Sequence, residues 1–387
     1  MKKIIIVINN LQTGGVQISL LNLLKEIHND YDVTVLSFYY KDEYRNLIPD
    51  NVHLISVNSL FRYFGISQGE LRGKPLQYAT RAFLATLARL FGRSFTIKLM
   101  SLFQKTIGTY DCAISYLHEG GQKSFYGGCN EFVLKKVKAE KKVAWLHCDF
   151  EQSGANNTKS QKIYRQFDSI VACSEGCRQS FLRCIPDLQA KTVSIRNCND
   201  YNRIRKLSEN EMLYENGFFN IVTVARLSGE KGIERAILAV KECLEKGFQV
   251  RYHLIGTGIM EKKLMDLVAE NNLSDTVRFY GNQTNPYRYV KNADLFLLPS
   301  YHEAAPMVFD EAACLGVPIL ATETTSTDEM ISKSNSGFVC ENSQEGLATA
   351  LLKILSDQNQ LMSIKKSLAN RIFDNAESVS RFSRIVV

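Results

Sequence analysis

Short apolar runs alternate with amphipathic segments along the first half of the chain. Each run is bounded by polar or glycine-containing residues, as a buried strand would be, and the longer segments carry apolar residues at helical spacing. The pattern predicts strands at residues 4–8, 33–37, 53–57, 112–116, 142–147 and 169–173, and a helix at 16–27. Buried strands that alternate with helices favour a parallel sheet covered on both faces.

The pattern breaks at residues 193–200, where a strand runs into a polar turn, and then begins again. It predicts strands at 220–224, 249–255, 276–280, 295–298 and 319–321, and helices at 233–246, 261–271, 347–355 and 361–373. A chain of 387 residues is too long for one typical core. We therefore expect an α/β protein with two doubly wound, Rossmann-like domains that face a central cleft at the carboxyl ends of their strands.

The predicted boundary of the two domains lies at residues 198 and 199. The first domain covers 1–198 and the second 199–371, and a last helix at about 372–387 is expected to pack back on the first domain. No apolar segment reaches the ~20 residues that cross a bilayer. The apolar run at the start is too short for a signal peptide and lacks a cleavage site, so it is better interpreted as a strand. The ten cysteines show no disulfide framework or zinc spacing, which favours reduced thiols in a cytoplasmic protein.

Positive charge is concentrated in the first half of the chain. Residues 1–200 hold 26 Lys and Arg against 17 Asp and Glu, a balance of +9, although the whole chain has +7. The segment 71–110 has no acidic residue and interleaves apolar side chains with seven basic ones: Arg72, Lys74, Arg81, Arg89, Arg93, Lys98 and Lys105. Such a stretch suits an anionic membrane surface. No nucleic-acid-binding motif accompanies it. The alternative is a pair of helices whose apolar face packs in the core and whose basic face is solvated.

An acidic residue stands where a helix should carry an apolar one. Residues 294–300 are predicted to be a buried strand, Pro306 suits the first turn of the next helix, and Gly316 suits its C-terminal cap. In that helix Glu311 shares a face with Val308, Ala312 and Leu315, so it is expected to point inward, whereas Asp310 points away. A buried carboxylate must be paired or hydrogen-bonded. It serves either a ligand or a neighbouring backbone amide.

Two basic residues follow the first strand of the second domain. Arg226 lies at the end of the strand and Lys231 lies just before a helix, and a diphosphate requires such fixed positive charge together with backbone donors at a helix N-terminus. A solvated loop charge remains the alternative. In the first domain Gly14-Gly15 would let the backbone approach phosphate or sugar closely, but a tight turn also explains it. Gly256-Thr257-Gly258 lacks the third glycine of a dinucleotide motif, so we interpret it as a turn.

Taken in order, these motifs resemble the retaining glycosyltransferases of family 4, which have the GT-B architecture. The resemblance is dense from about residue 220 to 330 and sparser before it. It rests on Gly14-Gly15, residues 225–232 (ARLSGEKG), 253–258 (HLIGTG), 279–281 (FYG), 293–300 (ADLFLLPS), and Glu303 with Glu311 before 316–322 (GVPILAT). Residues 145–147 (WLH), 167–174 (FDSIVACS) and 195–197 (IRN) match positions that lead to the hinge.

The resemblance implies a role for each matching residue. Glu303 would bind the hydroxyls of the donor sugar, Glu311 the ribose, and Arg226 and Lys231 the phosphates. The donor site would also include Gly14, Gly15, Ala304, Ala305, Met307 and Val308, with Gly281 and Asn282 near the base. His147 would lie beside the reacting sugar, unless it is a structural histidine at a strand end. The catalytic set is thus Glu303, His147, Arg226 and Lys231. Ala304, where many members have Gly, and Thr324–Thr327, where many have paired glycines, leave the donor sugar open.

The function implied is transfer of a hexose or N-acetylhexosamine, with retention, from a nucleotide-diphosphate sugar, UDP by preference, to a lipid-linked, lipopolysaccharide or capsule glycan. No cofactor or metal is required, because no Asp-x-Asp motif stands at a strand end and the two cations would stabilise the leaving diphosphate. The first domain would bind the acceptor and the second the sugar nucleotide, and the enzyme would lie on the inner face of the cytoplasmic membrane. Two alternatives remain: a GT-B enzyme with a soluble acceptor, such as an epimerase or sucrose-type synthase, and a non-catalytic module that binds nucleotide sugars or glycans.

Overall fold

A computed structural model describes residues 1–12, 14–57, 60–121, 123–209 and 214–387. The chain forms two compact units. The first contains Met1–Cys198 together with Asn375–Val387, and the second contains Asn199–Asp374. The predicted boundary at residues 198 and 199 coincides with the observed one, whereas the return to the first unit follows Asp374 and not residue 371. The last helix belongs to the first unit.

The first unit is built on a seven-stranded sheet in the order β3-β2-β1-β4-β5-β6-β7. Every pairing among its described strands is parallel. The strands are β1 Lys3–Leu11, β2 Asp32–Tyr40, β3 His53–Ser56, β4 Ile107–Ser115, β5 Val137–Leu146, β6 Ser169–Ala172 and β7 Thr192–Ser194. The first six coincide with predicted strands, and β7 lies where a strand was expected to run into a polar turn. β4 and β5 begin at Ile107 and Val137, earlier than predicted, because polar and partly exposed residues separate these first apolar residues from the continuous apolar run of each strand.

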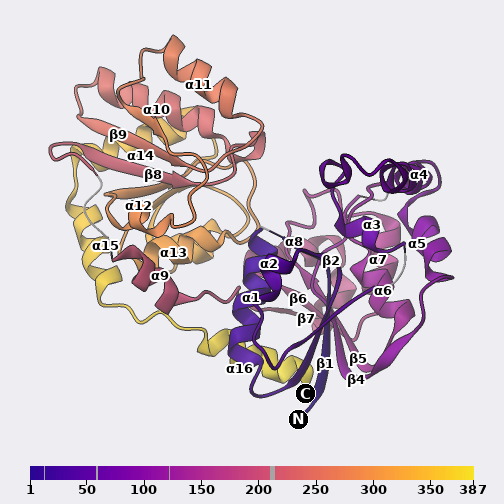
Figure 1. The fold of residues 1–387 in the computed structure, drawn as a ribbon. Coiled ribbons are helices and arrows are strands. Elements are labelled where there is room, and N and C mark those ends of the chain that lie inside the picture. The colour runs from indigo at the N-terminus through magenta and orange to yellow at the C-terminus, as the bar shows by residue number, and fades with distance from the viewer. Residues whose placement is uncertain (13, 58–59, 122, 210–213) are drawn as a thin grey trace. The chain divides into compact units, whose positions relative to one another are not determined.

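Helices cover both faces of this sheet. Helix α1 (Gly15–Ile27) buries its leucines against one face, where α16 (Ala376–Val386) also packs, and α6 (Cys129–Lys136) lies against the other face (Figure 1). The other helices are α2 Asp42–Arg45, α3 Arg62–Gly65, η1 Gly69–Leu71, α4 Pro75–Phe91, α5 Arg93–Ser101, α7 Thr158–Tyr164, α8 Glu175–Cys184 and η2 Pro186–Lys191. Phe382 of α16 lies 5.9 Å from Tyr31 and 6.3 Å from Trp145, measured between ring centroids, which ties the end of the chain to the first unit.

The second unit has a six-stranded parallel sheet in the order β10-β9-β8-β11-β12-β13. Its strands are β8 Phe219–Val224, β9 Val250–Ile255, β10 Val277–Phe279, β11 Leu295–Leu298, β12 Ile319–Thr322 and β13 Gly337–Cys340. Strand β13 was not predicted. It is short, begins with glycine and is only half-buried, so it has no distinct apolar run. The reversal of strand order on either side of β8 and β11 is the topological switch of a doubly wound fold.

Two layers of helices enclose the second sheet. Helices α10 (Ile233–Glu245), α11 (Glu261–Glu270) and α14 (Gln344–Ser356) pack on one face (Figure 1). On the other face lie α9 Tyr201–Ser208, α12 Tyr287–Lys291, α13 Met307–Cys314 and α15 Asn359–Ala369. The short turns η3 Gly229–Lys231 and η4 Asp328–Ser332 complete the unit. The α/β fold with two doubly wound parallel sheets is therefore as predicted.

Candidate active site

The predicted donor residues of the second unit gather at one edge of its sheet. Arg226 follows β8, Gly281 and Asn282 follow β10, and Glu303 follows β11. Because all six strands are parallel, their carboxyl ends meet at the same edge, which is where open α/β sheets bind ligands. The Arg226 side chain is exposed there, and so is Asn282.

Lys231 and Glu303, 72 positions apart in the sequence, form an ion pair at this edge. The Lys231 Nζ atom lies 2.5 Å from Glu303 Oε1, and the same carboxylate oxygen accepts a hydrogen bond of 2.7 Å from the Ser300 hydroxyl. Both side chains are mostly buried, with 22% and 11% of their surfaces exposed. A charge pair of this kind, held in place by a further hydrogen bond, keeps its two groups in fixed positions.

The loop that carries Glu303 is held by side chains from three neighbouring elements. Thr322 at the end of β12 donates to the Ser300 carbonyl at 2.6 Å. The Asn342 amide donates to the carbonyl of Tyr301 at 3.1 Å. The guanidinium of Arg235 in α10 donates to the Pro299 carbonyl and lies 3.8 Å from the centre of the Tyr301 ring. The sequence analysis did not identify this supporting role of Arg235. The sequence indicates it only by placing a basic residue in the otherwise apolar first turn of α10.

A glycine turn supports the loop that carries Arg226. A Cβ atom on Gly256 would lie 1.9 Å from the Ala225 carbonyl oxygen, and one on Gly258 would lie 2.1 Å from that of Leu227. The two loops are joined by a hydrogen bond of 3.0 Å from the Leu227 amide to the Thr257 carbonyl. These close contacts explain why glycine stands at both positions of the turn, since only glycine permits such an approach of two backbones.

Glu311 is less buried than the helical pattern predicted. The buried face of α13 consists of Met307, Phe309, Ala312, Ala313 and Cys314, whereas Glu311 is half-buried, as are Val308 and Asp310. The predicted contrast between an inward Glu311 and an outward Asp310 is not seen in their exposure, because both side chains are half-buried and the helix also turns Met307 and Phe309 inward. Loss of solvent, and then the charge of Asp310, raises the pKa of Glu311 to about 7.

Among the described residues no hydrogen bond contributes to the pKa of Glu311. A carboxylate that serves as a structural link to a backbone amide would show one. The structure therefore gives no support to that alternative and leaves the carboxylate available to a ligand.

His147 and the paired glycines belong to the first unit. His147 directly follows β5, is half-buried, and its ring lies 4.7 Å from that of Tyr116. Loss of solvent, with a contribution from His118, lowers the pKa of His147 to about 3. Gly14 is the N-cap of α1, and a Cβ atom on Gly15 would meet no atom within 4 Å. The open space beside Gly15 leaves its backbone accessible.

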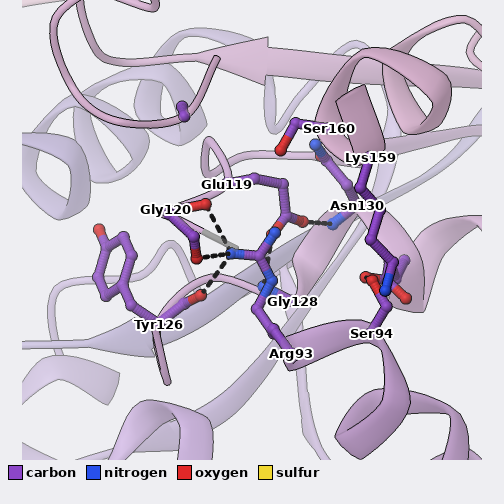
Figure 2. A network of polar contacts seen from close by, with 12 residues as sticks. Arg93, Ser94, Glu119, Gly120, Tyr126, Gly128, Asn130, Lys159 and Ser160 are labelled. Atoms are coloured by element: carbon purple, nitrogen blue, oxygen red, sulfur yellow. Dashed lines mark hydrogen bonds and ion pairs between the residues drawn. The ribbon is translucent and has the colours of Figure 1, made fainter. Parts of the chain in front are cut away.

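Arg93 does not belong to the basic surface to which the sequence analysis assigned it. Its side chain is 3% exposed and lies 2.8 Å from a carboxylate oxygen of Glu119, which is fully buried. The guanidinium also donates to the carbonyls of Gly120 at 2.8 Å, Gly121 at 3.2 Å and Tyr126 at 3.4 Å (Figure 2). Sequence spacing could not reveal this, because Glu119 lies 26 positions away and outside the basic segment.

Arg81 is only partly available at that surface. It is half-buried, donates to the Ile66 carbonyl at 2.7 Å and lies over the Phe125 ring. The remaining five residues of the basic set are exposed: Arg72, Lys74, Arg89, Lys98 and Lys105. The apolar residues of the same helices are also exposed to an unexpected degree. In α4 only Leu84 and Ala88 are buried. The alternative in which the apolar face packs in the core therefore describes only a minority of these side chains.

The described residues contain no cluster of three or more His, Cys, Asp or Glu side chains that could hold a metal ion. Asp149 and Glu151, which imitate an Asp-x-Asp motif, have structural partners. Asp149 accepts a hydrogen bond from the Ser180 hydroxyl at 2.5 Å, and Glu151 pairs with Arg183 at 2.9 Å.

Among the residues that the structure describes, no helix is both long and apolar enough to span a bilayer.

Comparison with known proteins finds a family match within the second unit. Residues 206–371 match the family model of glycosyl transferases group 1. The amylovoran biosynthesis glycosyltransferase AmsK of Erwinia amylovora is 34% identical over 143 residues, which cover 35% of each chain. The putative colanic acid biosynthesis glycosyltransferase WcaL of Escherichia coli K12 is 32% identical over 164 residues, or 39% of this chain and 40% of that protein. The matched segments thus span about two fifths or less of these relatives.

Solved structures share the fold over nearly the whole chain. HepE of Anabaena, crystallised in complex with UDP, superposes with a TM-score of 0.68, covers 99% of both chains and is 19% identical. WaaG, a glycosyltransferase involved in lipopolysaccharide biosynthesis, superposes with a TM-score of 0.60 over 94% of both chains at 15% identity. The chain therefore carries a group 1 glycosyl transferase domain at residues 206–371 and has the GT-B fold.

Proposed function

We propose that this protein is a retaining glycosyltransferase that moves a hexose or N-acetylhexosamine from a UDP-sugar to a growing surface glycan. The observation that carries the proposal is the ion pair between Lys231 and Glu303 at the carboxyl edge of the second sheet. Arg226, which follows β8 at the same edge, has an exposed side chain. Those residues lie within the segment that matches the family model. The relatives named for amylovoran and colanic acid biosynthesis support a polysaccharide product. The UDP complex of HepE supports the choice of nucleotide.

Arg226 and Lys231 would stabilise the departing diphosphate. A nucleotide diphosphate leaves readily when its developing negative charge meets fixed positive charge and backbone donors. Lys231 ends η3, and only Gly232, the N-cap, separates it from α10. The first amide groups of a helix have no partner within it and can bind an anion. This arrangement supports transfer without a metal ion or other cofactor.

Glu303 would contact the transferred sugar without acting as a nucleophile. Its carboxylate is already engaged by Lys231 and Ser300, which lowers its nucleophilicity and fixes its position. Retention would then come from attack by the acceptor hydroxyl on the same face from which the phosphate departs, and the phosphate would take the proton. Glu311, which lacks a described hydrogen bond, would accept hydrogen bonds from the ribose.

We also propose that the first unit contacts an anionic membrane that carries the acceptor lipid. Helices α4 and α5 and the residues after them expose eight large apolar side chains: Leu76, Tyr78, Phe83, Leu90, Phe91, Phe95, Leu102 and Phe103. Five exposed basic residues lie in the same segment, which contains no acidic residue. Apolar groups beside Lys and Arg are the combination that binds at the headgroup region of anionic bilayers.

Nucleotide release tests the proposal. The protein is incubated with UDP-glucose, UDP-galactose, UDP-N-acetylglucosamine and GDP-mannose, and thermal stabilisation and free nucleotide are measured with and without EDTA. We expect a UDP-sugar to stabilise the fold and to be slowly hydrolysed, with no effect of EDTA. The Lys231→Met variant should release nucleotide on the order of 100-fold more slowly, whereas Lys262→Met, at an exposed position of α11, should match the wild type. Stabilisation without release would indicate a binding module instead.

A further inference from the structure

Two positions at which this chain differs from many of the glycosyltransferases that it resembles are in direct contact. Ala304 directly follows Glu303, and Ser326 lies in segment 324–327 after β12, where many of those proteins have paired glycines. The Ser326 hydroxyl donates a hydrogen bond to the Ala304 carbonyl. Because glycine has no hydroxyl to donate, this bond between the loop after β12 and the loop that carries Glu303 is a feature of the present sequence.

The same two segments are joined at two further points. At the end of β12 the Thr322 hydroxyl donates to the Ser300 carbonyl at 2.6 Å. The Asn342 side-chain amide donates to the carbonyls of Tyr301 at 3.1 Å and Glu323 at 2.8 Å, one in each segment. Together with the bond described above, these contacts hold the loop after β11 at residues on both sides of its glutamate.

The position of the Glu303 carboxylate depends on these bonds. Its Oε1 atom lies 2.5 Å from Lys231 Nζ and accepts a hydrogen bond of 2.7 Å from the Ser300 hydroxyl. On the other side the chain leads to the Ala304 carbonyl, which Ser326 holds in one direction. Loss of that bond frees the peptide group after Ala304 to turn and lets Glu303 shift with it. A shift of about 1 Å in a group that contacts substrate can lower a rate about 100-fold.

Side-chain bonds also fix the segment that supplies Ser326. The Thr327 hydroxyl accepts a hydrogen bond from the Thr324 amide and donates one to the Thr324 carbonyl, both at 2.9 Å. Ser326 is 1% exposed, so its bond to the Ala304 carbonyl is shielded from water. Residues 324–327 are all described, and none of them has a positive φ, so their backbone does not require glycine.

We propose that Ser326 is a positioning residue that acts through Ala304 on Glu303 and thereby determines which donor sugar this chain accepts. This inference rests on the proposed function, because Glu303 is the residue proposed to contact the transferred sugar. The bond acts next to that carboxylate and not on Arg226. Its loss should therefore change recognition of the sugar and leave recognition of UDP as it is.

Donor selectivity tests the proposal directly. Hydrolysis of UDP-glucose, UDP-galactose and UDP-N-acetylglucosamine is measured for the wild type and Ser326→Ala, well below the unfolding temperature. We expect kcat/KM for the best donor to fall at least about tenfold. Its ratio to the kcat/KM of the second-best donor should fall at least about threefold, with the affinity for UDP unchanged.

Ser208→Ala is the matched control. Ser208 is also buried and its hydroxyl also donates to a backbone carbonyl, that of Arg205 at 2.7 Å in α9, so its removal deletes the same kind of bond elsewhere in the second unit. This variant should keep the donor selectivity of the wild type. Unchanged selectivity of Ser326→Ala would overturn the proposal even if its melting temperature falls, because a bond with a purely structural role affects stability alone.

A binding measurement separates this inference from the proposed function. If the wild type releases no nucleotide, the proposed function fails, and the inference is judged on the affinities for UDP and for each UDP-sugar, measured by calorimetry. The ratio of these two affinities is the contribution of the sugar. For at least one UDP-sugar it should differ at least about threefold between Ser326→Ala and the wild type, and Ser208→Ala should match the wild type. An equal ratio in all three proteins would show that Ser326 does not act on the sugar site.

Discussion

At the scale of single residues, Glu311 is the clearest case of a group that the fold holds at a cost. Its pKa is raised from 4.5 to about 7, chiefly by loss of solvent. The folded protein therefore keeps a proton on Glu311 that the unfolded chain releases, and between these two values stability falls as pH rises. Above about pH 7 the whole penalty is present. A carboxylate held in this state gains from a ligand that donates hydrogen bonds to it.

Glu311→Gln should remove that penalty. The variant should be more stable than the wild type without ligand, by about 1–2 kcal/mol at pH 8 and by little at pH 5. Its affinity for UDP should fall about tenfold, because a neutral amide binds ribose hydroxyls less strongly than a carboxylate does. Thermal unfolding at both pH values and a UDP titration measure the two effects. Glu270→Gln, at an exposed position, is the control. A variant that is less stable at pH 8 and binds UDP normally would return Glu311 to a structural role.

Gly15→Ala separates a role in ligand approach from a role in chain geometry. A Cβ atom at this first position of α1 would meet nothing within 4 Å, and alanine favours a helix more than glycine does. We expect the melting temperature to stay the same or to rise by one or two degrees, while UDP-sugar hydrolysis falls at least about tenfold. Gly69→Ala, where a Cβ atom would lie 4.0 Å from its nearest contact, serves as the control. A destabilised Gly15→Ala would support the tight-turn alternative.

At the scale of elements, the buried Arg93–Glu119 pair joins α5 to the loop that precedes α6. Arg93→Met leaves Glu119 buried without its cationic partner, which typically costs about 3–5 kcal/mol. The double variant Arg93→Met with Glu119→Gln should recover part of that loss, because no unpaired charge remains. Trp145, the only tryptophan, is buried in the first unit, so its fluorescence reports the unfolding of that unit. Arg89→Met, exposed in α4, should have almost no effect. Equal stability of Arg93→Met and Arg89→Met would disprove the role of the pair.

The strands were predictable because a parallel sheet covered on both faces requires continuous apolar runs. β13 was not predicted, because its four residues are only half-buried and form no continuous apolar run. The sequence also did not predict which basic residues of segment 71–110 are buried. Arg93 and Arg89 are four residues apart on neighbouring helices, and only the tertiary position of Glu119 distinguishes a buried charge from an exposed one.

The positions of the candidate donor residues were easier to predict than their contacts. Arg226, Lys231 and Glu303 each stand at the end of a strand or the start of a helix, and topology alone brings such positions to one edge. The ion pair between Lys231 and Glu303 could be recognised only in the structure. The supporting role of Arg235 was not predicted, because it depends on the Pro299 carbonyl and the Tyr301 ring, and sequence does not show these contacts.

At the scale of the whole molecule, charge and exposed apolar surface coincide in one segment of the first unit. Helix α4 is 17 residues long, yet only two of its side chains are buried. The left-handed Gly92, with a φ of 86°, turns the chain directly into α5, where Phe95 lies 5.3 Å from Phe91 between ring centroids. Exposed aromatic residues at this density are typical of interaction surfaces. Together with the five exposed cations of the segment, they are the basis of our proposal that the partner is an anionic membrane.

Sedimentation with lipid vesicles tests this surface. We expect the protein to pellet with phosphatidylcholine vesicles that contain phosphatidylglycerol, to pellet much less without the anionic lipid, and to be released partly by high salt, because each basic residue near the surface contributes about 1 kcal/mol. Phe91→Ser with Phe95→Ser removes two exposed rings, 62% and 47% accessible, and should lower binding at least about tenfold. Met362→Ser, 60% exposed in α15 of the second unit, should bind as the wild type. Equal recovery of wild type in the supernatant with both vesicle types would show that α4 and α5 serve another partner.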